Sequence, residues 1–221
     1  MTLGPKSTLI TGMTNAGHNT RTILLSQKEP GWILASRGSA ANIDAEAERL
    51  ATGHSQVKAF YIANLTSSSR PYDFTTQGRL MGWGLRNSVG IAEEPVTGGI
   101  FTVENSADQI RRSGTDVHNT NPGEEMNFHG FLNASTVSQG GNYGYPNCLA
   151  LWDTNIPNRG SMTVGSQFAV DRTTQTLTVD DAACEAARVK PRLTFTSHMA
   201  PLDMKFSRDG RTAYVSFHGS W

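Results

Sequence analysis

The sequence predicts an all-β fold, and three observations carry this prediction. Short runs rich in β-branched and aromatic residues recur between turn signals. Glycine is plentiful, with 22 residues in a chain of 221. Helical periodicity is scarce, and residues 42–51 are the one segment that reads as a short helix. The length corresponds to one large domain.

The expected strands are short and are separated by recognisable turns. Pro30-Gly31 separates the first two strands, and Asp209-Gly210 separates the last two as a strong hairpin signal. Antiparallel hairpins are therefore the expected unit of the fold. The strands are expected at residues 22–26, 32–36, 56–62, 99–103, 204–207 and 212–217.

Two hairpin segments, residues 18–39 and 198–220, resemble each other in the order of their features. Each has a His, a short polar step, a strand ending in Ser, a Gly turn, a second strand and a Gly-Ser exit. They lie too far apart for one repeat, but their separation suits several blades of a β-propeller, each a four-stranded sheet. The alternative is that any two hairpins look alike. A propeller would gather its connecting loops around a central channel, where ligands bind.

The composition argues against some classes of partner. Nineteen basic and nineteen acidic residues give a formal net charge of zero, which disfavours nucleic acid. No apolar run approaches the length that crosses a bilayer, so no membrane partner is expected. The first residues carry a single Lys and no sustained apolar core, unlike a signal peptide. The chain stops at Trp221 directly after an expected strand, and we therefore expect it to be a fragment.

The two cysteines, Cys148 and Cys184, lie in polar segments that read as loops. Neither has a CxxC partner, so a zinc site is not expected. Sequons at Asn64 and Asn133 would be glycosylated only in a secreted protein. Sequons also arise by chance, and two free thiols are common in cytosolic proteins. Together, these features favour a secreted parent with a Cys148–Cys184 disulfide.

Residues 82–127 are the most informative stretch for function. Arg86 and Asn87 stand as a consecutive pair in a glycine-rich segment, where the backbone can approach a ligand closely. A guanidinium fork beside an amide suits an anionic, carbonyl-rich ligand. The alternative is a surface loop with ordinary charges. The acidic residues of this stretch are Glu104, Asp108, Glu124 and Glu125.

An ordered series of motifs, which spans nearly the whole chain, resembles the glucose/sorbosone dehydrogenase group of quinoproteins. The resemblance is strongest to fungal pyranose dehydrogenases that use pyrroloquinoline quinone (PQQ). It implies a six-bladed β-propeller of roughly twice this length, extracellular in the family. Residues 1–221 would then be an incomplete propeller domain that lacks N- and C-terminal blades. The motifs are GHNTRTILLS (17–26), LASRGS (34–39), GHSQVKAF (53–60), GLRNSVGIAEEPVTGGIFTVENSADQI (84–110), NPGEEMNFHGFLN (121–133), NYGYPNC (142–148) and HMAPLDMKFSRDG with VSFHGSW (198–221).

The resemblance assigns roles to particular residues. His18 takes the place of the catalytic histidine, which would remove a proton from the anomeric hydroxyl as hydride leaves C1 for the quinone. Arg86 and Asn87 would contact PQQ. The alternative for Arg86 is an ion pair with Glu93 or Glu94.

The resemblance also implies a calcium site and further contacts. The backbone carbonyls of Ser106 and Ala107 are the expected calcium ligands, although residues 111–121 form an insertion that could shift this register. Tyr145 is expected to wall the flat cofactor, like Tyr143, with burial in the core as the alternative. His198 belongs to a motif that faces the channel in the family. Arg21 is expected to have a supporting role.

The sequence therefore predicts a PQQ- and calcium-dependent dehydrogenase that oxidises a pyranose sugar at the anomeric carbon. Electrons would pass to an external acceptor, such as a haem domain or protein, because no CxxCH motif occurs here. The alternative is an inactive, truncated propeller fragment that acts at most as a binding module. In either case, we expect little or no activity from these 221 residues alone.

Overall fold

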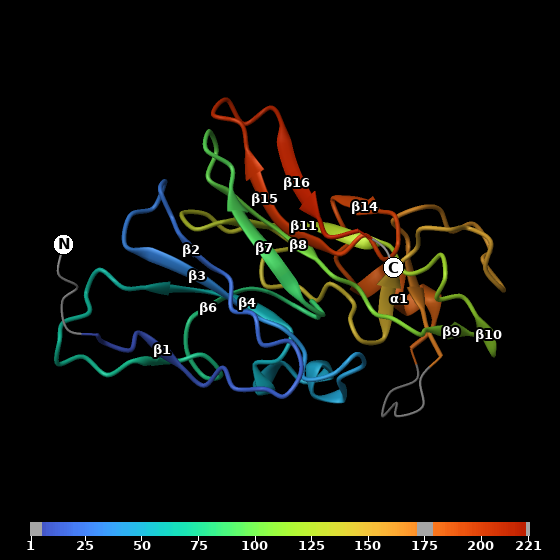
Figure 1. Cartoon of the computed structure of the whole chain (residues 1–221), viewed down its shortest axis with the longest axis horizontal. Helices are drawn as coiled ribbons and strands as arrows, with labels where there is room; N and C mark the ends of the chain where they lie inside the picture. The colour runs from blue at the N-terminus through green and yellow to red at the C-terminus, as the bar shows by residue number, and fades with distance from the viewer. Residues whose placement is uncertain (1–5, 172–178, 220–221) are drawn as a thin grey trace.

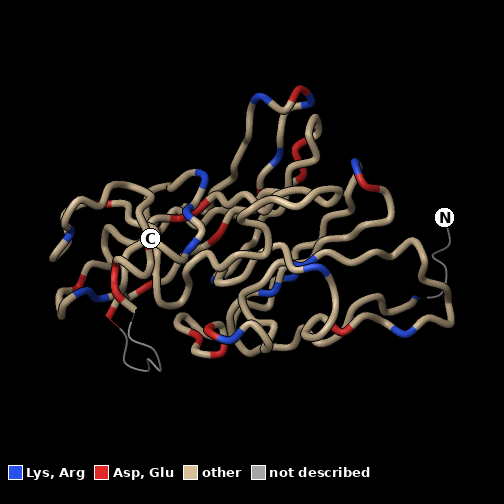
Figure 2. The backbone as a smooth tube through the Cα atoms, turned by 180° about the vertical axis from the view of Figure 1, so that it is seen from behind, with Lys and Arg blue, Asp and Glu red and all other residues tan. Residues whose placement is uncertain are grey.

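The computed structural model describes residues 6–171 and 179–219, and it is built mainly of sheets (Figure 1). This confirms the all-β prediction. Most connections are short, and two four-stranded antiparallel sheets lie near the centre of the molecule. Within the described residues, no helix is long and apolar enough to cross a membrane. Basic and acidic residues are interspersed along the chain (Figure 2).

The first four-stranded sheet has the order β2-β3-β4-β6. Its inner face buries Leu34, Val57 and Met81, which pack in one hydrophobic cluster. The β2–β3 hairpin turns at Gly31, whose φ of 95° and close approach to the side chain of Ala63 require glycine. The strands of this sheet are β2 (Ile23–Leu25), β3 (Trp32–Arg37), β4 (Gln56–Tyr61) and β6 (Arg79–Trp83).

The second four-stranded sheet has the order β14-β11-β8-β7. The register of its central pair places Glu125 of β11 opposite Glu104 of β8, so two carboxylates face each other inside the protein. The strands of this sheet are β7 (Ser88–Glu93), β8 (Gly99–Glu104), β11 (Glu124–Phe131) and β14 (Leu193–Phe195).

Four strand pairs complete the β structure. The pair β15–β16 is the hairpin expected at Asp209-Gly210, and it packs along the second sheet through Met204. The pairs are β1 (Ile10–Thr11) with β5 (Tyr72–Asp73), β9 (Arg111–Arg112) with β10 (Thr115–Asp116), β12 (Cys148–Ala150) with β13 (Gln167–Ala169), and β15 (Pro201–Phe206) with β16 (Ala213–Phe217).

The helical prediction was wrong in its details. Residues 42–51 form no α-helix but two 3₁₀ helices, Ala45–Glu48 and Leu50–Thr52, which are separated by the extended backbone of Arg49. The α-helix in the described part of the chain is α1 (Asp181–Ala187), which the sequence analysis missed. Asp180 caps α1 by accepting a hydrogen bond from the N–H of Ala183, and alanines fill the helix.

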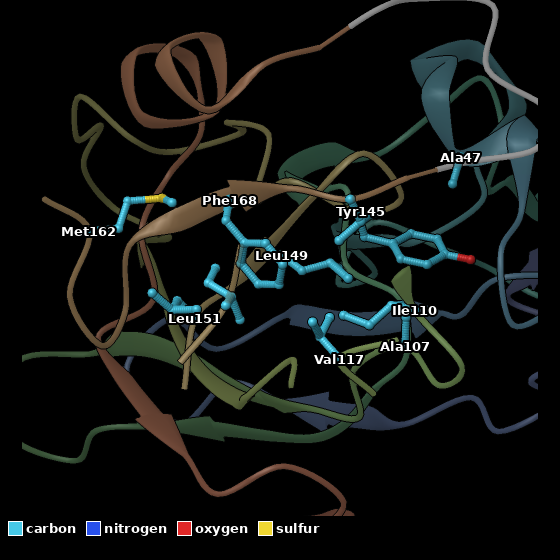
Figure 3. Close-up of a cluster of buried hydrophobic side chains, with 11 residues drawn as sticks. Ala47, Ala107, Ile110, Val117, Tyr145, Leu149, Leu151, Met162 and Phe168 are labelled. Carbon is cyan, nitrogen blue, oxygen red and sulfur yellow. The ribbon is translucent and has the colours of Figure 1, made fainter. Parts of the chain in front are cut away.

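A disulfide joins Cys148 and Cys184, with 5.6 Å between their Cα atoms, so the predicted pairing is confirmed. The expected surroundings were wrong, because Cys148 lies on β12 and Cys184 on α1, and both are fully buried. The bond therefore ties α1 to a strand at the edge of the largest core cluster. Figure 3 shows this cluster, in which Leu149, Leu151 and Phe168 meet at the centre.

The propeller expectation is met only in its coarser form. The two segments that resemble each other both form hairpins, but β2–β3 belongs to a four-stranded sheet whereas β15–β16 is a two-stranded one. Within residues 6–171 and 179–219, the strands close into neither a barrel nor a propeller. Ser220 and Trp221, which end the second segment and the last motif, lie outside the described residues. The six-bladed architecture stays a prediction.

Candidate functional site

A cavity of ≈ 350 Å³ brings together residues from loops that are far apart in the sequence. His18 precedes β2, Arg86 and Asn87 connect β6 to β7, Ser106 follows β8, and His198 precedes β15. All five line this cavity, as the sequence analysis predicted for a common site. A larger cavity of ≈ 640 Å³ lies between β2, β7 and β15, but it contains none of the predicted site residues.

His18 is oriented by Ser39. The Nδ1 atom of His18 lies 2.8 Å from the Ser39 hydroxyl and 3.2 Å from the Ser39 carbonyl oxygen. The carbonyl oxygen can only accept, and the hydroxyl already donates to the carbonyl of Ala41 at 2.7 Å. Nδ1 therefore carries the proton and donates it to Ser39. This leaves the Nε2 lone pair of a neutral imidazole as the basic atom.

The electrostatic surroundings keep His18 neutral. Burial and the nearby positive charge of Arg86 lower the pKa of His18 below its usual value. A neutral imidazole at physiological pH can accept a proton, as a general base must. Arg21 fixes the loop, since its guanidinium donates to the backbone carbonyls of His18 (2.7 Å) and Met13 (3.0 Å). This geometry agrees with the supporting role expected for Arg21.

Arg86 is a buried cation held in place by several acceptors. Its guanidinium donates to the carbonyl and side-chain oxygens of Asn42 at 3.1 and 2.9 Å, and to the carboxylate of Asp108 at 3.3 Å. It does not pair with Glu93 or Glu94, so the alternative interpretation of this arginine was wrong. Its side chain is rigid and positive before any ligand arrives, which suits an anionic ligand.

Glu124 joins two of the loops that form the cavity. Its carboxylate accepts the N–H of Ser106 at 2.6 Å and the N–H of Ala200 at 3.1 Å. Burial raises the pKa of Glu124, while these two hydrogen bonds favour the ionised form. The sequence analysis saw Glu124 only as an acidic turn. Its bridging role depends on Ser106 and Ala200, which lie 18 and 76 residues away in the sequence.

The loop at Ser106 and Ala107 fits the predicted calcium ligands through its backbone. No donor in the described part of the chain is directed at the carbonyl oxygen of either residue. Calcium takes oxygen ligands of this kind. Among the same described residues, no cluster of three or more His, Cys, Asp or Glu side chains could hold a metal. A metal here would therefore depend on these carbonyls and on a ligand.

Two further carboxylates lie behind the cavity wall. Glu104 accepts the backbone N–H of Arg86, and Asn127 donates to both Glu104 (3.4 Å) and Glu125 (2.9 Å). Burial raises the pKa of Glu125 to about 7, and burial together with Glu125 raises the pKa of Glu104 well above its usual range. Both carboxyl groups therefore hold a proton more tightly than a solvated carboxyl group does.

His198 and His218 complete the cavity. His198 has a left-handed backbone (φ 62°), and its Nδ1 lies 3.4 Å from a carboxylate oxygen of Asp108. The sequence analysis did not identify His218, although the VSFHGSW motif contains it. The N–H of His218 donates to the carbonyl of Ala200 at 3.0 Å, which brings β16 against the His198 loop.

Two predicted contacts are not brought into the cavity. Tyr145 is 2% exposed, and its ring lies in the core cluster (Figure 3), so its expected role as a wall of the cofactor site is corrected. Its hydroxyl lies 3.0 Å from the carbonyl of Asn42, the residue that holds Arg86. Ala107 also places its side chain in this cluster, which leaves only its backbone for a metal. Tyr143 is buried in a neighbouring cluster.

The two sequon asparagines do not line the cavity. Asn64 and Asn133 are both exposed, Asn64 in the turn after β4 and Asn133 in the bend after β11. Exposed turns are where glycans attach in secreted proteins. The geometry is therefore compatible with the predicted glycosylation, which stays a prediction.

Comparison with known proteins identifies the relatives of this chain. A pyrroloquinoline quinone-dependent sugar dehydrogenase from Hypocrea jecorina is 53% identical over 216 residues, which cover 97% of this chain and 49% of that protein. A calcium structure of a Trichoderma reesei carbohydrate-active enzyme of family AA12 superimposes with a TM-score of 0.91, covering 96% of this chain and 52% of that one, at 53% identity. The holo form of the pyranose dehydrogenase PQQ domain from Coprinopsis cinerea gives 0.85, covering 96% and 51%, at 36% identity.

The match extends along the whole sequence. The family model described as TrAA12-like matches residues 1–221. The chain spans about half the length of the first two of these relatives. The motifs, the sheets and the cavity residues all lie within the matched region. The chain therefore belongs to the TrAA12-like family.

Proposed function

We propose that this chain forms part of a PQQ- and calcium-dependent dehydrogenase that oxidises pyranose sugars at the anomeric carbon. One observation carries the proposal: a single cavity combines a neutral histidine base, a buried guanidinium and Ser106, whose backbone carbonyl accepts no hydrogen bond from the described residues. The names of the relatives, which are PQQ-dependent sugar dehydrogenases, point to the same chemistry. The chain covers half of such a protein, so its activity is a property of the larger polypeptide.

Arg86 and Asn87 would hold PQQ, which carries three carboxylates and an ortho-quinone. The guanidinium is already fixed by Asn42 and Asp108, so it needs little reorganisation to meet negative charge. Gly38 allows His18 and Asn87 to lie close to each other, since a Cβ there would lie 2.7 Å from the Asn87 side chain and 2.7 Å from that of His18. Bound PQQ would supply the quinone that accepts hydride from C1 of the sugar.

His18 would act as the general base. Its Nε2 atom is the free basic atom, because Ser39 fixes the proton on Nδ1. It would accept the proton of the anomeric hydroxyl, and the resulting imidazolium would face Asp108 and Asp44, whose charges favour it. Ser39 therefore sets both the tautomer and the direction of the imidazole.

Ser106 and Ala107 would hold calcium through their carbonyl oxygens. A divalent cation at this point would neutralise ligand carboxylates and polarise a carbonyl. Glu124 supports the site because it fixes the N–H of Ser106. The Arg86 guanidinium and the ion would then bind different parts of one ligand.

The larger protein would be a six-bladed propeller, and the two four-stranded sheets would be two of its blades. We propose that it is extracellular and glycosylated at Asn64 and Asn133, since both are exposed. The Cys148–Cys184 disulfide favours an oxidising compartment. Electrons would pass from the cofactor to an external acceptor, such as a haem domain or protein.

Reconstitution tests this proposal. The chain would be completed with the remaining half of the Hypocrea jecorina relative, loaded with PQQ and Ca²⁺, and offered pyranoses with a dye as electron acceptor. We expect PQQ-dependent dye reduction by the completed chain and little or none by residues 1–221 alone. A completed chain that folds and binds PQQ but oxidises no pyranose would contradict the proposal. Completed protein that binds no PQQ would favour the alternative, an inactive binding module.

A further inference from the structure

Two neighbouring cavities extend the candidate site along one face. The first, of ≈ 520 Å³, shares His198 with the site cavity and includes Trp152. The second, of ≈ 590 Å³, shares Asn119, Thr120 and Asp153 with the first. Each of the three cavities therefore adjoins the next through shared lining residues. We call the cavities of ≈ 520 and ≈ 590 Å³ together the outer groove.

Residues 111–121, the insertion noted in the sequence, build one wall of the outer groove. They form the β9–β10 hairpin at the right of Figure 1 and the turn that carries Asn119 and Thr120. Arg112, which is 5% exposed, anchors this hairpin. Its guanidinium donates to both carboxylate oxygens of Asp181, at 2.8 and 2.6 Å, and to the carbonyl of Ala169 at 2.9 Å. The wall is therefore a fixed surface rather than a loose loop.

The same insertion fixes the position of Trp152. The side-chain oxygen of Asn121 accepts the N–H groups of Trp152 (2.8 Å) and Asp153 (3.2 Å), and its amide donates to the carbonyl of Asp153 (2.9 Å). Asn121 is fully buried, whereas Trp152 stays half-exposed at the groove. A large apolar ring is thus held beside open space, with its backbone immobilised.

The lining chemistry identifies the class of ligand. Neither of the two outer cavities has a lysine or arginine among its described lining residues, so an anionic ligand finds no partner there. Short polar side chains line the same cavity as Trp152, including Asn119, Thr120 and Thr154, together with the apolar Val164 and Met199. A flat apolar ring among short polar groups suits a neutral polyol ring, with C–H groups on the indole and hydroxyls on the rim.

We propose that the outer groove is a subsite for the second and third glycosyl units of an oligosaccharide whose reducing end lies in the site cavity. This inference rests on the proposed function, because it takes the pyranose at His18 as the first unit. His198 borders both spaces, so the first glycosidic link would pass beside it.

Calorimetric titration of residues 1–221, without PQQ, tests the subsite. The ligands are glucose, cellotetraose and maltotetraose, and the variants are Trp152→Ala, Trp152→Phe, Asn119→Ala and Tyr214→Ala. Tyr214 is a matched control, because it is 63% exposed on β16 and absent from the groove lining. We expect at least one tetraose to bind about tenfold tighter than glucose, a difference of about 1.4 kcal/mol.

The variants should separate stacking from folding. Trp152→Ala should remove this advantage, and Trp152→Phe should keep most of it, because phenylalanine retains a flat ring. Asn119→Ala, at an exposed position, should weaken only the tetraose, and Tyr214→Ala should change nothing. Equal affinity for glucose and both tetraoses, or unchanged tetraose affinity in both Trp152→Ala and Asn119→Ala, would overturn the proposal.

This test is independent of the redox function. If a tetraose binds at Trp152 but PQQ binds nowhere, the proposed dehydrogenase activity fails and the subsite stands. If PQQ and Ca²⁺ bind but the tetraoses bind no better than glucose, the subsite fails and the dehydrogenase proposal stands.

Discussion

The two four-stranded sheets bury different ionisable groups, a lysine in the first and glutamates in the second, and these groups hold different parts of the molecule. In the first sheet, Lys58 of β4 donates to the backbone carbonyls of Phe74, Thr75 and Gln77 at 2.7, 3.1 and 3.4 Å. These carbonyls belong to a loop that lines no part of the candidate site. Burial lowers the pKa of Lys58, and the three acceptors compensate for part of its lost hydration.

In the second sheet, the buried acidic residues are glutamates, and two of them accept backbone N–H groups from residues of the cavity. Glu104 accepts from Arg86, and Glu124 accepts from Ser106 and Ala200. The comparison teaches that a buried charge is not in itself a sign of function. What matters is which loop it fixes, because Lys58 supports the fold whereas Glu104 and Glu124 support the site.

His18→Ala should have the largest effect, and it should change the rate rather than the fold. The loss of a general base costs about 10²–10⁴ in rate, and the imidazole hydrogen bonds only to Ser39 in the described structure. Turnover of the completed, PQQ-loaded chain should fall by this factor while PQQ affinity stays close to wild type. Steady-state kinetics and a PQQ titration measure the two effects. Equal losses of affinity and rate would show that His18, like Lys58, has a structural role rather than a catalytic one.

Lys58→Met should have the largest effect on folding. It leaves carbonyls of the 74–77 loop without their donor, at a cost of about 1–3 kcal/mol for each group that stays buried and unpaired. The free energy of unfolding, measured in urea, should fall by this order. Lys205→Met is the control, because the side chain of Lys205 is 69% exposed and its removal should be nearly neutral. Equal stability of both variants would contradict the structural role of Lys58.

Glu124→Ala should lower stability and also disturb the site, which Lys58→Met should not do. The substitution leaves the N–H groups of Ser106 and Ala200 without an acceptor. Each N–H that stays buried and unpaired should lower the free energy of unfolding by about 1–3 kcal/mol. The Ser106 loop would lose its anchor, so calcium-dependent stabilisation should weaken. Thermal unfolding with and without Ca²⁺ checks this result. A variant that keeps the full calcium effect would remove the distinction between the two sheets.

Glu125→Gln should change how stability depends on pH. The pKa of Glu125 rises from 4.5 to about 7 on folding, so the folded state binds the proton more tightly. Its contribution to stability is therefore complete below pH 4.5 and is lost as the pH rises through about 7. Glu104 acts in the same direction. Thermal unfolding midpoints should fall less steeply across this range in the variant, and parallel curves would contradict the assignment.

The sequence predicted the strands better than their association. Turn signals such as Pro30-Gly31 and Asp209-Gly210 placed both hairpins, because turn chemistry is local. The helix α1 was missed because seven residues are too few to establish a period. Residues 42–51 were misread because Arg49 adopts an extended backbone, which no local pattern indicated.

The candidate site was also predicted only in part from the sequence. Motif resemblance predicted that His18, Arg86 and Ser106 share one site, and the structure places them around one cavity. It failed for Tyr145, because an aromatic residue in a motif can line a cavity or fill a core, and the difference depends on packing. The bridging role of Glu124 depends on Ala200, which is distant in the sequence, so no local signal could have revealed it.

The central claim is that the cavity around Arg86 and Ser106 binds PQQ through calcium. Titration of residues 1–221 with PQQ, in Ca²⁺ and in excess chelator, tests it most directly. Arg86→Ala is the variant in the candidate site, and Lys58→Met is the control variant in the first sheet, away from the site. The account predicts binding that requires Ca²⁺, that weakens about tenfold or more in Arg86→Ala, and that persists in folded Lys58→Met. Equal PQQ affinity in chelator, or unchanged affinity in Arg86→Ala, would contradict it.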